Sequence, residues 1–154
     1  EDFRAGIIYA YANSYLKVYP TVDIAVFRNN KTEILLGKKD IDQKWRLPGG
    51  FSDPTDESYE AAAQRELREE CGSIEVSPMV YEGSFRVNDW RYKNEEDKII
   101  TTLFSTDYIF GDVLGSDDIA EVQWFSLQTV AEMMNHQKIA FEHIPQFNFL
   151  LRKY

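Results

Sequence analysis

The sequence is poor in the features that mark secreted and membrane-spanning proteins. Its 154 residues include one cysteine, Cys71. A single cysteine cannot form an internal disulfide, so we expect a reducing, cytoplasmic location. No run approaches the roughly 18 apolar residues that a membrane span requires, and the first residues do not resemble a signal peptide. We therefore expect no membrane partner.

The chain also lacks an excess of positive charge. It has 17 Lys and Arg against 26 Asp and Glu, which gives a formal net charge of −9. An acidic chain gains nothing from counterion release on a polyanion, so we expect no general DNA or RNA partner. A phosphate-bearing small molecule remains open as a ligand, provided that a cation meets its charge.

Length and composition indicate an ordinary globular protein. Hydrophobic residues make up 44% and charged residues 28% of the chain, and neither value is typical of disorder. No repeat, low-complexity tract or linker interrupts the sequence. We therefore expect residues 1–154 to form a single domain.

Alternating apolar residues and turn residues predict the order of elements. Strands are expected at residues 21–27, 33–39, 74–87, 99–110 and 121–125. Helices are expected at residues 57–71, from Ser126 to about Gln137, and near Pro145, and residues 3–16 are a further helix candidate. This order predicts an α/β fold in which a mixed sheet lies between helices on both faces.

Residues 57–71 (ESYEAAAQRELREEC) are the strongest helix candidate, because Ala, Leu, Glu, Arg and Gln all favour helices. Asp53, Thr55 and Asp56 offer side-chain oxygens for its N-terminus. Gly72 stands where a residue of left-handed conformation commonly ends a helix.

Three carboxylates on this helix, Glu66, Glu69 and Glu70, share one face because of their i, i+3 and i+4 spacing. Like charges at this spacing repel one another, which is tolerable on a solvated face and useful around a divalent cation. The pair Gly49-Gly50 precedes the helix, where a residue without Cβ lets the backbone approach a ligand or metal. This arrangement favours a hard-metal site next to a phosphate site over a merely solvated helix face.

Gly50, Glu57 and residues 65–72 (RELREECG) resemble the Nudix box, G-x5-E-x7-R-E-U-x-E-E-x-G-U, in which U is apolar. The second half fits at every fixed position up to the glycine, and Glu57 stands seven residues before Arg65. Two departures exist. Six residues rather than five separate Gly50 from Glu57, and Ser73 occupies the final apolar position.

The resemblance implies the Nudix fold, a mixed sheet sandwiched between helices, and the hydrolysis of a nucleoside diphosphate linked to another moiety. It implies Mg²⁺ or Mn²⁺ as cofactor, bound by Glu66, Glu69 and Glu70 and by the carbonyl of Gly50 or Gly49. Glu57 and Arg65 would orient the catalytic helix and its carboxylates. The catalytic set implied in this way is Glu57, Arg65, Glu66, Glu69 and Glu70.

The general base has several candidates. Some Nudix enzymes use a glutamate of the box, and others use a glutamate of a downstream loop. The polar loop 88–98 offers Glu95, Glu96 and Asp97, although a merely solvated acidic loop is an equal interpretation. Poorer candidates for the same role are Asp117, Asp118 and Glu121.

Segments outside the Nudix box show weaker similarities that indicate a substrate class. The segments YPTVDI at 19–24 and LPGGF at 47–51 resemble Nudix enzymes that act on ADP-ribose. The segment IAFEH at 139–143 resembles the end of that group and of related regulators, whose winged-helix DNA-binding domain does not fit into 154 residues. The predicted substrate-binding residues are Arg46, Phe51, Trp90, Arg91 and Tyr92.

The chemistry of these side chains supports the choice, since an aromatic ring stacks on adenine and an arginine binds phosphate or ribose. Packing at a strand end is the alternative for Trp90 and Tyr92. His136 and His143 are interpreted as helix-end residues, and Cys71 as a small buried side chain.

The sequence therefore predicts a Nudix pyrophosphohydrolase that converts ADP-ribose to AMP and ribose 5-phosphate. The alternatives are a nucleoside triphosphate or dinucleoside polyphosphate pyrophosphohydrolase, and a Nudix-fold sensor that binds a nucleotide without turnover. By analogy with relatives, a homodimer is also considered, with residues 3–19 at its interface.

Overall fold

The structure is a computed structural model that describes residues 2–154. Its elements follow in this order: α1 (Asp2–Ala12), β1 (Val18–Arg28), β2 (Glu33–Lys39), β3 (Trp45–Arg46), β4 (Gly49–Phe51), α2 (Tyr59–Cys71), β5 (Glu75–Val76), β6 (Val80–Val87), the 3-10 turn η1 (Trp90–Tyr92), β7 (Lys98–Phe110), β8 (Ile119–Ser126), α3 (Leu127–Asn135), the 3-10 turn η2 (Phe141–His143) and α4 (Ile144–Lys153).

The strands form one mixed sheet with the order β3-β2-β1-β7-β5, to which β4, β6 and β8 add by pairing with β1, β7 and β2. Its centre is the parallel pair of β1 and β7, which runs in register from Val18 opposite Lys98 to Phe27 opposite Asp107. All other strand pairs are antiparallel. The predicted mixed sheet is confirmed.

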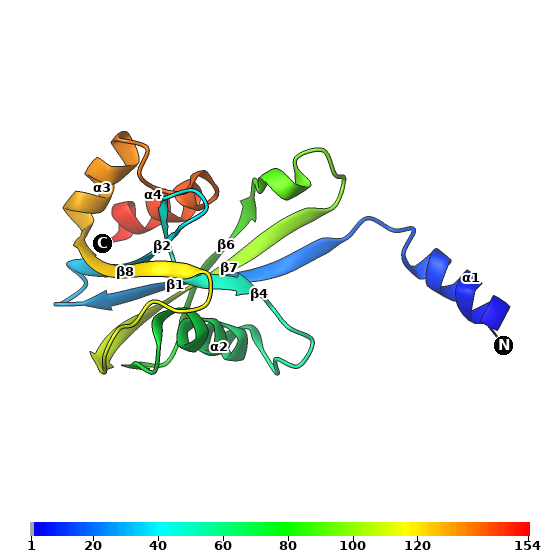
Figure 1. Cartoon of the computed structure of the whole chain (residues 1–154), viewed down its shortest axis with the longest axis horizontal. Coiled ribbons are helices and arrows are strands. Elements are labelled where there is room, and N and C mark those ends of the chain that lie inside the picture. The colour runs from blue at the N-terminus through cyan, green and yellow to red at the C-terminus, as the bar shows by residue number, and fades with distance from the viewer. Residues whose placement is uncertain (1) are drawn as a thin grey trace.

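Helices cover both faces of this sheet, with α2 on one side and α3 and α4 on the other (Figure 1). Alternate residues of β1 face opposite ways, and both sets are buried because both faces are covered. Val22, Ile24 and Val26 pack with Ala62, Ala63 and Leu67 of α2. Ala25 and Phe27 pack with Val130 of α3 and with Phe147 and Leu150 of α4.

Helix α2 begins two residues later than predicted, at Tyr59, because Ser58 rather than an upstream residue caps it. The Ser58 hydroxyl accepts a hydrogen bond from the Ala61 amide at 3.1 Å. The carboxylates of Asp53 and Asp56 are occupied within the preceding loop, where they accept backbone N–H groups. Gly72 ends the helix with a φ of 84°, as predicted.

Cys71 closes α2 inside the core. Its side chain is fully buried, and burial raises the pKa of the thiol to about 12. A thiolate is therefore strongly disfavoured, and the interpretation of Cys71 as a small buried side chain is confirmed.

The predicted strand at 74–87 is wrong in one respect, since it is two strands. Residues 77–79 separate β5 from β6, and Pro78 lacks the N–H that a continuous ladder would use. Ser77 holds the interruption against β7, because its amide donates to the Asp107 carbonyl at 2.9 Å and its carbonyl accepts the Thr106 hydroxyl at 2.6 Å.

Helix α1 extends away from the rest of the molecule (Figure 1), and none of its residues is buried. Its apolar side chains are therefore exposed, among them Phe3 at 80% and Tyr9 at 72%. Within residues 2–154, no helix has the length and hydropathy needed to cross a membrane.

Candidate active site

Two glycines bring the backbone of β4 between β1 and α2. Gly49 has a φ of 153°, and a Cβ at this position would lie 2.0 Å from the Val22 carbonyl oxygen. A Cβ on Gly50 would lie 2.7 Å from the Glu66 carboxylate. The Gly49 N–H donates to Oε2 of Glu70 at 2.9 Å. At Gly49 only a glycine allows this close approach, and the Gly49 amide holds the Glu70 carboxylate of α2 against the sheet.

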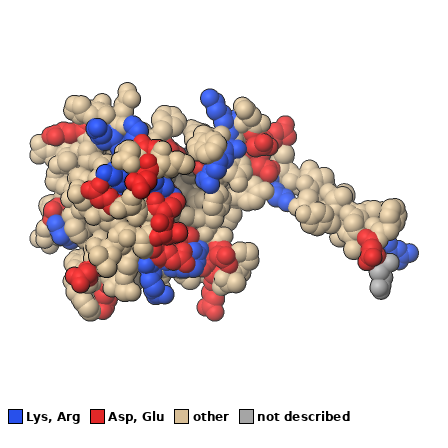
Figure 2. Space-filling model, in the orientation of Figure 1, with Lys and Arg blue, Asp and Glu red and all other residues tan. Residues whose placement is uncertain are grey.

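A cavity of about 490 Å³ opens beside these glycines. Its size lies within the range of small-molecule sites. The charged and polar side chains that line it are Thr21, Asp23, Lys39, Arg46, Ser52, Asp53, Arg65, Glu66, Glu70, Asp89, Arg91, Asp117, Asp118, Glu142, His143 and Gln146. Acidic atoms gather across the middle of the molecule in Figure 2.

The charge of the lining is dominated by acids, with eight carboxylates against four basic side chains. Burial raises the pKa of Glu66, with smaller contributions from Glu69 and Asp117. Burial also raises the pKa of Glu70 to about 8. Desolvated carboxylates that repel one another are stabilised by a bound cation, so the chemistry of this donor set fits a divalent metal.

The chemistry of these carboxylates fits a divalent metal, but their positions do not form a complete coordination site. Among residues 2–154, no three His, Cys, Asp or Glu side chains surround a common point as metal ligands do. Glu66 and Glu69 instead both contact Nη1 of Arg65, at 2.7 and 3.1 Å. Binding a cation with both carboxylates would require this guanidinium to give up part of these contacts.

Arg65 is the centre of the ion pairs at the start of α2. Its Nε and Nη2 atoms donate to the two carboxylate oxygens of Asp56, each at 2.9 Å. Its Nη2 atom also donates to the Phe51 carbonyl at 3.1 Å. Hydrogen bonds from Arg65 lower the pKa of Asp56 to about 2, and the pair ties the loop after β4 to the helix.

The partner of Arg65 corrects the prediction for Glu57. The Glu57 side chain is exposed and does not line the cavity. Asp56 makes the contact expected of Glu57, because its side chain points back toward α2 from a position just before the helical cap. Five residues, as the box requires, separate Gly50 from Asp56, so the spacing already contained this signal.

The loop between β7 and β8 supplies acidic residues next to the C-terminal end of α2. Its amides at Leu114 and Ser116 donate to the last carbonyls of that helix, Cys71 at 3.0 Å and Glu70 at 3.1 Å. The loop therefore ends the helix and brings Asp117 and Asp118 to the cavity. Both were ranked as poorer base candidates on sequence grounds, and the structure places them beside the carboxylate cluster.

The favoured loop candidates lie elsewhere. Glu95, Glu96 and Asp97 are absent from the cavity lining. Asp97 instead accepts the Lys17 amide at 2.8 Å, on the side of the molecule from which α1 extends. Glu121 forms an ion pair with Lys38. The structure therefore does not bring these four carboxylates to the glutamates of the box.

The predicted substrate-binding residues divide into two groups. Arg46, Phe51 and Arg91 line the cavity, and the Arg91 guanidinium lies 5.5 Å from the Phe51 ring centroid. Trp90 and Tyr92 do not line it. Trp90 is 80% exposed, and Tyr92 packs against Tyr19 with ring centroids 5.6 Å apart. Tyr92 therefore has the packing role that was the alternative to substrate binding.

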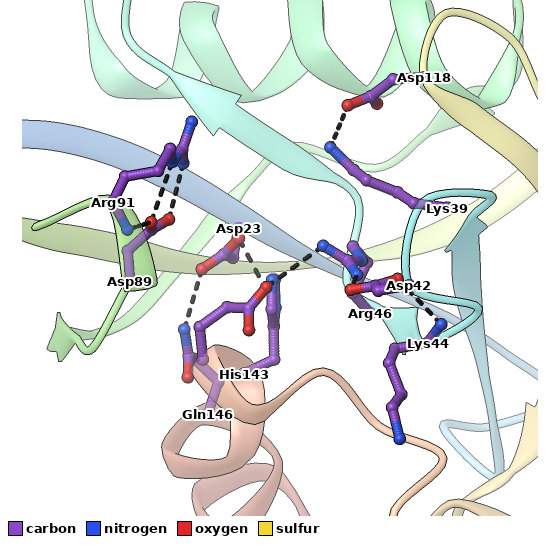
Figure 3. A network of polar contacts seen from close by, with 11 residues as sticks. Asp23, Lys39, Asp42, Lys44, Arg46, Asp89, Arg91, Asp118, His143 and Gln146 are labelled. Atoms are coloured by element: carbon purple, nitrogen blue, oxygen red, sulfur yellow. Dashed lines mark hydrogen bonds and ion pairs between the residues drawn. The ribbon is translucent and has the colours of Figure 1, made fainter. Parts of the chain in front are cut away.

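A polar cluster that the sequence interpretation missed lies at the end of the cavity formed by β1 and α4 (Figure 3). Asp23 accepts hydrogen bonds at Oδ2 from Thr101 at 2.7 Å and from Gln146 at 3.0 Å. His143, interpreted from sequence as a helix-end residue, is buried beside Asp23, and burial lowers the pKa of its imidazole. Asp23 and His143 lie in the segments 19–24 and 139–143 noted in the sequence, but their contact depends on the fold, and no motif marks Thr101 or Gln146.

Comparisons with known proteins agree with this geometry. The family model described as NUDIX domain matches residues 18–147, so the chain belongs to the Nudix family and is a Nudix hydrolase. An ADP-ribose pyrophosphatase of Methanocaldococcus jannaschii is 31% identical over 132 residues, which cover 84% of this chain and 70% of that protein.

Two further relatives extend the comparison. The NAD-capped RNA hydrolase NudC of Pseudomonas aeruginosa is 26% identical over 129 residues, 83% of this chain, and the chain spans only 43% of its length. The NUDIX domain of Shewanella oneidensis NrtR, solved in complex with ADP ribose, has a TM-score of 0.72 at 21% identity and covers 95% of this chain and 97% of its own. The last similarity establishes the fold.

The Arg65 contacts predict different effects for neighbouring carboxylates. Because the folded-state pKa of Asp56 lies below its unfolded value, its ion pair stabilises the fold above about pH 4 and loses this effect as the pH falls toward 2. We expect Asp56→Asn to lower the urea midpoint of unfolding at pH 7 and to approach the parent chain at low pH. Glu57→Gln is the matched control and should leave the midpoint unchanged. A larger loss in Glu57→Gln would contradict the assignment.

Proposed function

We propose that this chain is a divalent-metal-dependent pyrophosphohydrolase that cleaves ADP-ribose to AMP and ribose 5-phosphate. One observation carries the metal dependence. Each basic side chain that lines the cavity is already paired with a carboxylate: Lys39 with Asp118, Arg46 with Asp42 and Glu142, Arg65 with Asp56, and Arg91 with Asp89. Since these cations are neutralised, a pyrophosphate needs a recruited cation to enter the acidic cavity.

The proposed metal ligands are Glu66, Glu69 and Glu70, with a backbone carbonyl at Gly49 or Gly50. When bound, Mg²⁺ or Mn²⁺ neutralises a pyrophosphate, polarises phosphorus and lowers the pKa of an attacking water. The protein contributes the positioning. The Gly49 N–H fixes one oxygen of Glu70, and Arg65 holds Glu66 and Glu69 on the same side of α2.

The proposed substrate rests on the relatives together with the cavity. The archaeal relative is named an ADP-ribose pyrophosphatase, and the NrtR domain was solved with ADP ribose. The mixed lining of this cavity, acidic at α2 and with Phe51 and Arg91 at its side, suits a nucleotide with a charged and an aromatic part. Cleavage of triphosphates or dinucleoside polyphosphates and nucleotide sensing without turnover are the competing functions.

We further propose Asp117 as the general base, or as the residue that orients the attacking water. It lines the cavity next to the C-terminal end of α2 and lies close enough to Glu66 to raise the pKa of that carboxyl, after the larger effect of burial. Its backbone has a φ of 57°, a left-handed conformation that directs the turn before β8. The glutamates of the box remain the alternative.

Two wider expectations remain proposals. We propose that residues 1–154 act as a single Nudix domain, since the family match at 18–147 covers nearly all of the chain. We also propose a cytoplasmic location, for which the single buried cysteine is the supporting observation.

Substitution of the proposed ligands tests the metal site. We expect Glu69→Gln and Glu70→Gln each to lower Mg²⁺-dependent release of AMP from ADP-ribose by about 100-fold or more, as does the loss of a preorganised electrostatic contact in other enzymes. Glu60→Gln removes the same charge from an exposed position of α2 and should retain full activity. Circular dichroism of each variant verifies that the helix is intact.

A substrate panel separates the competing functions. The panel contains ADP-ribose, NADH, dinucleoside tetraphosphate, nucleotide sugars, dNTPs and NAD-capped RNA, each with Mg²⁺. Fastest turnover of another member would replace the proposed substrate. Binding of ADP-ribose without product release from any member would establish the sensor function. Full activity of the Glu69 and Glu70 variants would refute the ligand assignment.

The base assignment predicts an effect on turnover rather than on binding. We expect Asp117→Asn to lower kcat by about 100- to 10,000-fold, the usual range for a general base, with a small change in KM. Glu96→Gln, from the loop outside the cavity, should keep the parental kcat. Parental kcat in Asp117→Asn would leave the glutamates of the box as the base.

We retain the homodimer as a proposal, with α1 as the interface. This helix has no buried residue, and its large apolar side chains Phe3, Ile7, Ile8, Tyr9 and Tyr11 are all more than half exposed. Sedimentation equilibrium should give a dimer for the full chain and a monomer after deletion of residues 1–16. A monomeric full chain at micromolar concentration would refute the proposal.

A further inference from the structure

The polar cluster at the β1 and α4 end of the cavity contains a carboxylate oxygen without a hydrogen bond. Asp23 is 7% exposed, and both of its donors, Thr101 and Gln146, bind the same oxygen, Oδ2. Its Oδ1 atom has His143 Nδ1 at 3.8 Å, which is too long for a hydrogen bond. Oδ1 is not among the fully buried atoms without a partner, and Asp23 lines the cavity, so a ligand donor could reach this oxygen and bind it.

Two neighbours of Asp23 each contain a fully buried atom without a hydrogen-bond partner. Among the described residues, Nδ1 of His143 and Oε1 of Gln146 have no hydrogen-bond partner, although both side chains belong to residues that are at least nine-tenths buried. Both residues line the same cavity as Asp23. Figure 3 shows that the side chains of Asp23, His143 and Gln146 lie together. Each of these side chains keeps an oxygen or nitrogen atom without a hydrogen bond among the described residues.

The chemistry of these atoms favours a sugar over a nucleobase. Oδ1 of Asp23 and Oε1 of Gln146 only accept hydrogen bonds, whereas the edge of adenine offers a donor beside an acceptor. The aromatic carbocycle among the lining residues is Phe51, which lies with Arg91 and not in this cluster. Neighbouring sugar hydroxyls each donate and accept, so they satisfy two acceptors and an imidazole without a stacking surface.

We propose that Asp23, His143 and Gln146 form a subsite for the vicinal hydroxyls of a ribose ring of the substrate. The inference rests on the proposed function, because it takes the substrate to be a nucleoside diphosphate linked to a sugar. The hydroxyls belong either to the nucleoside ribose or to the linked ribose. The subsite lies next to the carboxylates of α2, since the Asp23 and Gly49 residues are paired in register and the Gly49 amide binds Glu70.

The experiment compares ADP-ribose with its 2′-deoxy analogue in the nucleoside ring and with its 2″-deoxy analogue in the linked ring. For each compound, kcat/KM is measured with Mg²⁺. Kd is measured by calorimetry under conditions in which the compound is not hydrolysed. We expect the parent chain to lose about 10- to 100-fold in both quantities on one of the two analogues, the effect of one hydrogen bond to a charged group. The affected analogue identifies the ring.

Two variants assign this preference to the cluster. In Asp23→Asn, the amide oxygen is expected to stay with the Thr101 and Gln146 donors, so an NH2 group replaces Oδ1 and an acceptor becomes a donor. Gln146→Met removes the other acceptor at similar volume. Both variants should reduce the preference for the hydroxylated compound to less than about threefold, because the hydrogen bond that supports it is lost. Asp107→Asn, an exposed aspartate paired with Lys31, is the matched control and should retain the preference.

The outcomes separate the subsite from the proposed reaction. A chain that binds ADP-ribose with the deoxy penalty but does not hydrolyse it would refute the proposed function and support the subsite. A chain that hydrolyses ADP-ribose with no penalty on either analogue would support the function and refute the subsite. An unchanged penalty in folded Asp23→Asn and Gln146→Met would also refute it.

Discussion

The close passage of the Gly49-Gly50 backbone between β1 and α2 is the constraint on which the rest of the site depends. On one side, a Cβ at Gly49 would overlap the Val22 carbonyl, and on the other, a Cβ at Gly50 would meet the Glu66 carboxylate. The backbone contact at Gly49 therefore requires glycine, whereas the flexible end of the Glu66 side chain could move away from a Cβ at Gly50. Because the Gly49 amide also binds Glu70, the same peptide fixes a carboxylate that would otherwise leave the protein interior.

The charged residues of this site are arranged so that several carboxylates lie close together without destabilising α2. The helix tolerates Glu66, Glu69 and Glu70 on one face because Arg65 contacts two of them and is itself held by Asp56. The remaining basic residues around the cavity are paired in the same way. Part of the net charge of −9 therefore lies around the cavity. Among the described residues, the cavity offers an anionic substrate no unpaired Lys or Arg.

The sequence predicted the parts of this protein that depend on local order. The mixed sheet, helix α2 with its three glutamates and its glycine end follow from periodicity and spacing within short segments. Asp56 was missed because the box was matched to a glutamate, although the geometry depends on which carboxylate reaches Arg65. The cluster of Asp23, His143 and Gln146 was missed for a deeper reason, since β1 and α4 meet only when the chain folds and no spacing along the sequence records that contact.

Substitutions are expected to have different effects at the α2 end and at the α4 end of the cavity. At α2, the geometry of three carboxylates, an arginine and two glycines is interlocked, so a change at one position displaces the others. At α4, Gln146 and His143 project from the last elements of the fold toward β1, and their side chains touch the site without supporting α2. Under the proposed function, a substitution there would alter which sugar is accepted while Glu66, Glu69 and Glu70 stay in place. Because the two ends have separate structural support, the proposed ribose subsite could change in this chain without displacing the proposed metal ligands.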